Sequence, residues 1–231
     1  MVKAVFFDWF NTLIHPDPER HEIYLASYRE FGVDLDLKEL LSGILRAEEQ
    51  FPEGNPIKWL DSGPKEPFVR YQEVLQSECG VTVPPDVTVK IVRRLYTRAN
   101  RISYSLYDDV IPTCQRFKER GLILGLLTNM EKSIDPVLRG VGLAPYLDVV
   151  VTSEEAGANK PDPPIFLMAL ERAGVNAQEA IYVGDQYGTD ILGARGVGIN
   201  AILLNRLGLV KEPMDCPEIQ TLTELDSYIF V

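Results

Sequence analysis

The sequence feature that most restricts the fold is a short, mostly apolar segment, residues 3–7, which lies far along the chain from the other strand-like segments. It reads KAVFF and leads directly into Asp8. A run of this length and composition is typical of a short buried strand. Because the backbone groups of a buried strand need hydrogen-bonding partners, we expect this segment to pair with strands that occur much later in the chain.

Strand-like and helix-like segments alternate from about residue 105 onward. The predicted strands cover residues 122–128, 148–152, 180–185 and 200–204. Alternation of this kind is typical of a parallel sheet whose strands are joined by crossover helices. The sequence therefore predicts an α/β protein with a doubly wound, Rossmann-like parallel sheet, formed by residues 1–15 and 105–231.

The intervening block, residues 16–104, has a different pattern. Apolar residues recur at helical spacing in segments 20–31, 37–51, 68–80 and 87–101. The segment 52–67 is rich in Pro and Gly and is typical of a loop. We find no convincing strand in this block, so we expect residues 16–104 to form a helical domain inserted into the α/β core.

Charge and cysteine content restrict the partners and the compartment. The formal net charge of −11 argues against a nucleic-acid-binding protein, since phosphate backbones are held by basic surfaces. The three cysteines are widely spaced and odd in number, which is typical of a reducing compartment. The sequence has neither the pattern of a signal peptide nor an apolar run of membrane-spanning length. We therefore expect a cytoplasmic protein, a monomer or homodimer, with no nucleic-acid or membrane partner.

Polar residues stand where four of the predicted strands end. Ligands of open α/β sheets bind beyond the carboxyl ends of the strands, so these positions are candidate site residues. Each one alone also fits an ordinary role, as a turn former, a helix cap or a surface lysine. Their recurrence after four strands favours a functional site. The candidates are Asp8, Thr128, Asn129, Lys160, Asp185 and Asp190.

Four short motifs that contain these residues resemble those of the haloacid dehalogenase superfamily of hydrolases. In chain order they are FFDWFNTL, LLTN, NKPDP and VGDQYGTD. The order and spacing of the four motifs resemble the family over the whole predicted core. The helical block after the first motif is similar to the cap domain that one large subfamily carries at this point.

The resemblance implies covalent catalysis by Asp8, whose carboxylate would attack the substrate and form an aspartyl intermediate. Thr128 and Asn129 would bind the transferred group. Lys160 would offset its negative charge and keep the nucleophile ionised, as a cation within a few ångströms does.

The same resemblance implies a magnesium site. Asp185 and Asp190 would hold Mg²⁺ together with Asp8 and the backbone carbonyl of Phe10. An all-oxygen set of ligands suits this ion, and the cation would relieve the repulsion among three carboxylates. The implied substrate is a small phosphorylated metabolite.

Phe10 departs from the family pattern, because the phosphatases usually carry there a second aspartate that acts as acid and base. Phenylalanine cannot transfer a proton, and His15 is a possible substitute, although a simple loop position also explains it. The dehalogenases of the family also lack this aspartate, so a 2-haloacid dehalogenase is one alternative. A weakly active binding or regulatory module is another. Retention of both Asp185 and Asp190 leads us to favour a Mg²⁺-dependent phosphatase.

Overall fold

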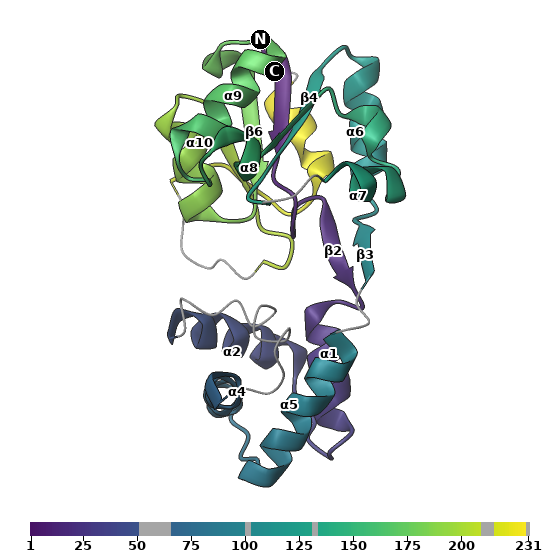
Figure 1. Ribbon diagram of the computed structural model, residues 1–231, viewed down its shortest axis with the longest axis vertical. Helices are drawn as coiled ribbons and strands as arrows, with labels where there is room; N and C mark the ends of the chain where they lie inside the picture. The colour runs from purple at the N-terminus through teal and green to yellow at the C-terminus, as the bar shows by residue number, and fades with distance from the viewer. Residues whose placement is uncertain (51–65, 100–102, 131–133, 209–214, 230–231) are drawn as a thin grey trace. The chain divides into compact units, whose positions relative to one another are not determined.

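The structure, a computed structural model, describes residues 1–50, 66–99, 103–130, 134–208 and 215–229 (Figure 1). The chain divides into two compact units. The core unit comprises residues 1–15 and 105–231, and the helical unit comprises residues 16–104.

The core unit is built on a parallel sheet with the strand order β5-β4-β1-β6-β7-β8. The strands are β1 (Ala4–Phe7), β4 (Ile123–Thr128), β5 (Val149–Thr152), β6 (Ala180–Gly184), β7 (Asn200–Leu204) and β8 (Glu218–Ile219). The first strand lies between β4 and β6, where Phe7 is in register with Leu126 and Val183. The predicted parallel sheet is thus confirmed, and the N-terminal strand occupies its interior.

Both faces of this sheet are covered, as a doubly wound fold requires. Along β1, Val5 and Phe7 belong to one apolar cluster, and Ala4 and Phe6 to the other. Successive residues of a strand point to opposite faces of the sheet. Because both faces are covered, all four side chains are fully buried. The continuous apolar run AVFF is the composition expected of a strand that is buried on both faces.

Short helices and single turns connect the strands and form the two outer layers (Figure 1). The helices are α6 (Val110–Glu119), α7 (Asp135–Gly140), α8 (Ser153–Ala156), α9 (Pro163–Ala173), α10 (Leu192–Gly196) and α11 (Asp226–Ile229). The single turns are η1 (Ala144–Tyr146), η2 (Ala177–Glu179), η4 (Leu222–Leu225) and the π-helical turn η3 (Tyr187–Ile191). Helices α6 and α9 contribute to opposite apolar clusters.

The helical unit contains α1 (Arg20–Arg29), α2 (Leu37–Gln50), α4 (Glu66–Glu78) and α5 (Pro85–Ala99). The apolar sides of these helices form a separate cluster, which also encloses a polar chain of hydrogen bonds. Tyr28 donates to Gln72, Gln76 donates to Tyr28, and Thr88 donates to Gln76. Each of these buried groups therefore has a partner. Residues 52–65 of the predicted loop lie outside the described part of the chain.

The sequence prediction was wrong in one respect, since the ends of the inserted block contain strands. Strands β2 (Ile14–Asp17) and β3 (Ser103–Leu106) form a two-stranded sheet where the chain passes between the units. Neither segment has a strong apolar alternation, and β2 contains a proline, so their pairing was not visible locally. Among the helices that the structure describes, none has the length and apolar character needed to cross a membrane.

Candidate active site

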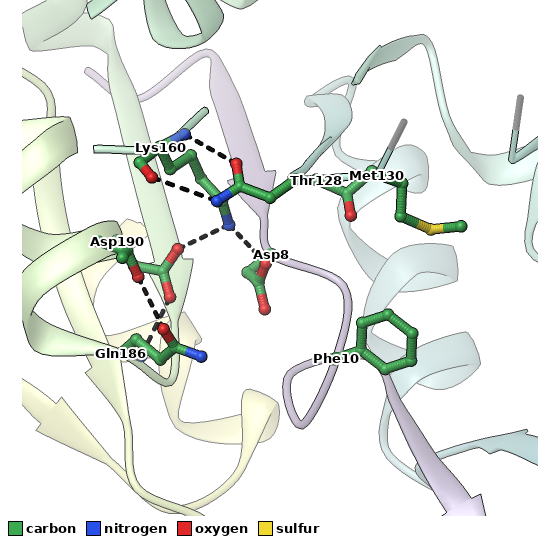
Figure 2. Close-up of a pocket in the computed structure, with 9 residues that line it drawn as sticks. Asp8, Phe10, Thr128, Met130, Lys160, Gln186 and Asp190 are labelled. Atoms are coloured by element: carbon green, nitrogen blue, oxygen red, sulfur yellow. Dashed lines mark hydrogen bonds and ion pairs between the residues drawn. The ribbon is translucent and has the colours of Figure 1, made fainter. Parts of the chain in front are cut away.

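The candidate residues converge because they follow neighbouring strands of one sheet. Asp8 follows β1 directly, Thr128 is the last residue of β4, and Asp185 follows β6 directly. Lys160 lies between α8 and α9, in the segment that follows β5. A pocket of about 130 Å³ opens at this edge of the sheet (Figure 2). It is lined by Asp8, Phe10, Thr128, Asn129, Met130, Lys160, Gln186, Thr189 and Asp190.

The buried ammonium group of Lys160 connects the acidic residues of the pocket (Figure 2). Its Nζ atom lies 2.5 Å from Asp8 Oδ1 and 2.7 Å from Asp190 Oδ1. It also donates to the hydroxyl oxygen of Tyr182 at 2.9 Å. That hydroxyl in turn donates to Asp190 Oδ1 at 3.0 Å. The three N–H bonds of the ammonium group thus meet three acceptors.

The electrostatics of this cluster reflect burial as well as charge. Burial raises the pKa of Asp8 to about 6, against the lowering effect of Lys160 and with a further increase from Asp190. For Lys160, burial alone lowers the pKa, but the carboxylates of Asp8 and Asp190 outweigh it and the net shift is upward. Lys160 therefore stays positively charged. Its charge offsets only part of the effect of burial on Asp8, so the pKa of Asp8 stays above its ordinary value.

Asn129 fixes the loop that carries the lysine. Its side-chain oxygen accepts a hydrogen bond from the backbone N–H of Lys160 at 2.7 Å, and its amide nitrogen donates to the Lys160 carbonyl at 3.2 Å. The turn after β4 is thereby joined to the segment that precedes α9. A substrate-binding role for Asn129 stays a prediction, since the observed contacts of its amide are with this loop.

Three carboxylates come close together beside the lysine. One ligand oxygen from each of Asp8, Asp185 and Asp190 lies within 4.8 Å of the others. Asp185 accepts a hydrogen bond from Asn11 through Oδ2, whereas its Oδ1 is buried and receives none from the described residues. Burial, and then the charges of Asp8 and Asp190, raise the pKa of Asp185 to about 8.

This donor set fits a divalent cation that prefers oxygen. The three carboxylates provide only hard oxygen ligands, the type that Mg²⁺ binds, and the unsatisfied Oδ1 of Asp185 faces an energetic cost that a cation would remove. The predicted contribution of the Phe10 backbone carbonyl stays a prediction.

The end of β6 is shaped to receive the carboxylate of Asp190. A Cβ atom at Gly184 would lie 2.4 Å from Asp190 Cγ, so a side chain there is excluded while Asp190 keeps this position. The π-helical turn η3 carries Asp190, and the backbone N–H of Gln186 donates to its Oδ2 at 3.0 Å. Local π-helical turns often occur at functional sites.

Several site residues were not predicted from the sequence. Thr12 donates to Asp8 Oδ2 at 3.3 Å, and Tyr182 links Lys160 with Asp190. Thr12 lies four residues after the candidate nucleophile inside the first motif, so its position was a usable signal. Tyr182 had no such signal, because in the sequence it is one more large residue of a buried strand. Met130, Gln186 and Thr189 also line the pocket, and the sequence does not mark them as site residues.

Position 10 places an aromatic ring at the pocket. Phe10 lines the pocket and is 41% exposed. His15, the possible substitute for the missing acid, packs its ring against Tyr107 with the centroids 4.7 Å apart and is not among the pocket-lining residues.

A parallel α/β sheet with its polar cluster at the carboxyl edge defines a class of fold that many enzymes share. Comparison with known families narrows this class, because a model of the haloacid dehalogenase-like hydrolases matches residues 2–198. The chain belongs to this family of hydrolases, which confirms the resemblance seen in the four motifs.

Individual relatives include enzymes named as phosphatases. The glyceraldehyde 3-phosphate phosphatase of Methanopyrus kandleri is 32% identical over 212 residues, which cover 89% of this chain and 85% of that protein. A solved HAD phosphatase from Thermococcus onnurineus is 26% identical with a TM-score of 0.57, over 99% of this chain and 98% of that one. These relatives agree with the prediction of a phosphatase.

A dehalogenase shares the fold as well. The 2-haloacid dehalogenase of Pseudomonas syringae pv. Tomato is 24% identical with a TM-score of 0.57, covering 100% of this chain and 99% of that chain. A likeness at this level concerns the fold alone, so the choice of reaction depends on the residues of the site.

Proposed function

We propose that the chain is a Mg²⁺-dependent phosphatase that transfers a phosphoryl group from a small phosphoester to Asp8 and then to water. The observation that carries this proposal is the group of three carboxylates, in which a buried oxygen of Asp185 has no hydrogen bond from the described residues. A cluster of partly buried carboxylates lowers the stability of the folded protein unless a bound cation offsets their negative charge. The phosphatase relatives support the same class of reaction.

Asp8 is the proposed nucleophile. An oxygen of its carboxylate attacks the phosphorus atom, and the bond from phosphorus to the leaving oxygen breaks. Lys160 holds Asp8 Oδ1, and Thr12 donates to Oδ2, so both oxygens are oriented toward fixed partners. Thr128, buried at the end of β4, is proposed to bind the phosphoryl oxygens through its hydroxyl group.

The proposed metal ligands are Asp8, Asp185, Asp190 and the backbone carbonyl of Phe10. When bound, Mg²⁺ would supply charge that offsets the repulsion between the nucleophile and the phosphoryl group. Lys160 contributes its own positive charge at Asp8 and Asp190, and Asn129 holds the loop that positions this lysine.

The dehalogenase alternative accounts for Phe10 but not for the acidic cluster. Release of halide needs no proton, so an aromatic residue at position 10 is compatible with it. A metal-independent reaction at Asp8 gives no reason to place Asp185 and Asp190 near the nucleophile, where the charge of Asp190 raises the pKa of Asp8 and the charges of Asp8 and Asp190 raise the pKa of Asp185.

The test is a substrate screen with and without the cation. Purified protein is incubated with phosphate esters, acetyl phosphate and 2-haloacids, in Mg²⁺ or in EDTA. We expect release of inorganic phosphate that requires Mg²⁺ and is lost in Asp185→Asn. Equal release of halide from 2-haloacids in Mg²⁺ and EDTA would favour the dehalogenase. Tight binding of a partner protein, unchanged by Asp8→Asn and without hydrolysis of any compound, would favour the binding module.

A further inference from the structure

The pocket has a polar side and an apolar side. Lys160, Asp190 and Gln186 lie on one side of Asp8, and Phe10 and Met130 lie on the other (Figure 2). Phe10 is 41% exposed, while Met130 is half-buried and packs against the apolar cluster of the sheet. An aromatic ring and a thioether are surfaces on which a further ring packs well.

The small volume of the pocket limits what it encloses. Pockets that surround a whole small molecule typically measure roughly 300–1,000 Å³. At about 130 Å³, this pocket has room for the reacting phosphoryl group and the atoms bonded to it. Phe10 and Met130 line the same pocket as Asp8, so we expect them to contact the part of the leaving group nearest to the broken bond.

Among the described residues that line the pocket, few can donate a proton to a leaving group. The ammonium group of Lys160 gives its three N–H bonds to Asp8, Asp190 and Tyr182. Asp190 accepts from Lys160, Tyr182 and the backbone N–H of Gln186. Within the part of the chain that the structure describes, no other pocket-lining residue carries an acid or base, apart from the proposed nucleophile.

We infer that the substrates are small aryl phosphates, whose ring packs against Phe10 and Met130 and whose oxygen leaves without being protonated by the enzyme. This inference rests on the proposed phosphatase function and names its substrate class. A phenolic oxygen is a far better leaving group than an alkoxide, so it tolerates the loss of general acid catalysis. Phe10 thus occupies the position of the usual acid-base aspartate and also provides an apolar surface for the aryl ring.

The reaction balances without a further co-reactant. A bond forms between an Asp8 oxygen and phosphorus, while the bond from phosphorus to the aryl oxygen breaks. Its electron pair leaves with the phenolate, which takes a proton from water after release. Water then attacks the phosphorus, the pair of the breaking bond returns to Asp8, and the proton of the water goes to solvent as inorganic phosphate departs.

The first experiment measures how turnover depends on the leaving group. Substituted phenyl phosphates and glycerol phosphate are compared in Mg²⁺ for the wild-type protein and Phe10→Asp. We expect wild-type turnover of phenyl phosphate to exceed that of glycerol phosphate by at least about 100-fold, since general acid catalysis is typically worth 10² to 10⁴. In a folded Phe10→Asp variant this ratio should fall at least about 10-fold. Equal ratios in the two proteins would overturn the inference.

The second experiment isolates the contact with the ring. Acetyl phosphate has a good leaving group but no ring, so the ratio of kcat/KM for phenyl phosphate to that for acetyl phosphate reports ring packing. We expect this ratio to fall about 2- to 10-fold in Phe10→Ala and in Met130→Ala, the range of an aromatic contact. Leu167→Ala, which removes an exposed side chain of α9 outside the pocket, should leave the ratio unchanged. An unchanged ratio in both pocket variants would overturn the inference.

Different results would refute the inferred substrate class and the proposed phosphatase function. Hydrolysis of acetyl phosphate without preference for aryl over alkyl esters would remove the inference alone. Absence of Mg²⁺-dependent hydrolysis of every ester and of acetyl phosphate would remove the proposed function itself. Free phosphotyrosine and a peptide that contains it complete the series. Faster hydrolysis of the peptide would contradict a small-molecule substrate.

Discussion

The ammonium group of Lys160 meets three acceptors, two of which are carboxylates that belong to different motifs. Because Asp190 is buried beside Lys160, removal of the lysine charge leaves the Asp190 carboxylate without a cationic partner among the described residues. At the scale of single residues, the site is therefore a coupled unit in which each charge depends on its neighbours.

This coupling predicts the behaviour of Lys160→Met. Breaking a buried ion pair by removal of one partner typically costs about 3–5 kcal/mol, so we expect a loss of this size in the free energy of unfolding at pH 7. The double variant Lys160→Met with Asp190→Asn should recover part of the stability but no activity. Urea denaturation measures both. A single variant as stable as the wild type would contradict the coupling.

A different result is expected for Asp8→Asn. Burial raises the pKa of Asp8 to about 6, which means that the folded site disfavours the ionised carboxylate. We expect the neutral amide to leave the melting temperature at or above its wild-type value while turnover of phosphoesters is lost. Asp162→Asn makes the same chemical change at an exposed position before α9 and should keep activity. Retained turnover in Asp8→Asn would exclude the covalent mechanism.

At the scale of elements, β6 and the turn η3 hold Asp190 by close packing. The carboxylate of Asp190 lies directly against Gly184, the last residue of β6. Gly188, inside η3, has open space around the position of a Cβ atom. Two glycines four residues apart thus have opposite tolerance for a side chain.

We expect Gly184→Ala to displace Asp190 and to abolish Mg²⁺-dependent phosphate release, because the new methyl group would overlap the carboxylate. Gly188→Ala is the matched control and should keep most of the activity. Steady-state kinetics over a range of Mg²⁺ concentrations distinguishes loss of the metal site from loss of fold, with circular dichroism as the check on folding. Equal activities of the two variants would contradict the packing argument.

At the scale of the whole molecule, the acidic cluster makes stability depend on pH and on the cation. The pKa values of Asp8 and Asp185 are raised to about 6 and about 8 from an ordinary value near 4. Between about pH 4 and pH 8 the folded protein therefore binds more protons at these groups than the unfolded chain. It follows that their contribution to the free energy of unfolding falls as the pH rises through this window.

We expect the melting temperature in EDTA to fall between pH 5.5 and pH 8 by more in the wild type than in Asp185→Asn, which lacks the group with the larger shift. Mg²⁺ should raise the wild-type melting temperature more at pH 8 than at pH 5.5, because the cation binds the deprotonated carboxylates. Differential scanning calorimetry at both pH values tests this. Parallel profiles for the two proteins would contradict the assigned shifts.

The sequence by itself determined the class of fold and predicted which candidate residues lie at one edge of the sheet. Apolar periodicity is a local property, so the strands of the core and the helices of the insertion could be located within a few residues. Because the strands are parallel, Asp8, Thr128, Lys160 and Asp185 were expected at one edge before any contact was known. The motifs around them were specific enough to indicate the family, which the comparison then confirmed.

Only the tertiary structure decided which groups meet, since these contacts join residues that are distant in the chain. Tyr182 became part of the site because Lys160 reaches it across 22 positions of the sequence. Pairing of β2 with β3 was equally non-local, and neither strand had a strong pattern of its own. Phe10 was visible in the sequence as a departure from the family, but its place in the pocket that Met130 also lines depends on the turn after β1 and the end of β4. Local patterns fix which elements form, whereas packing between them fixes the chemistry that they bring together.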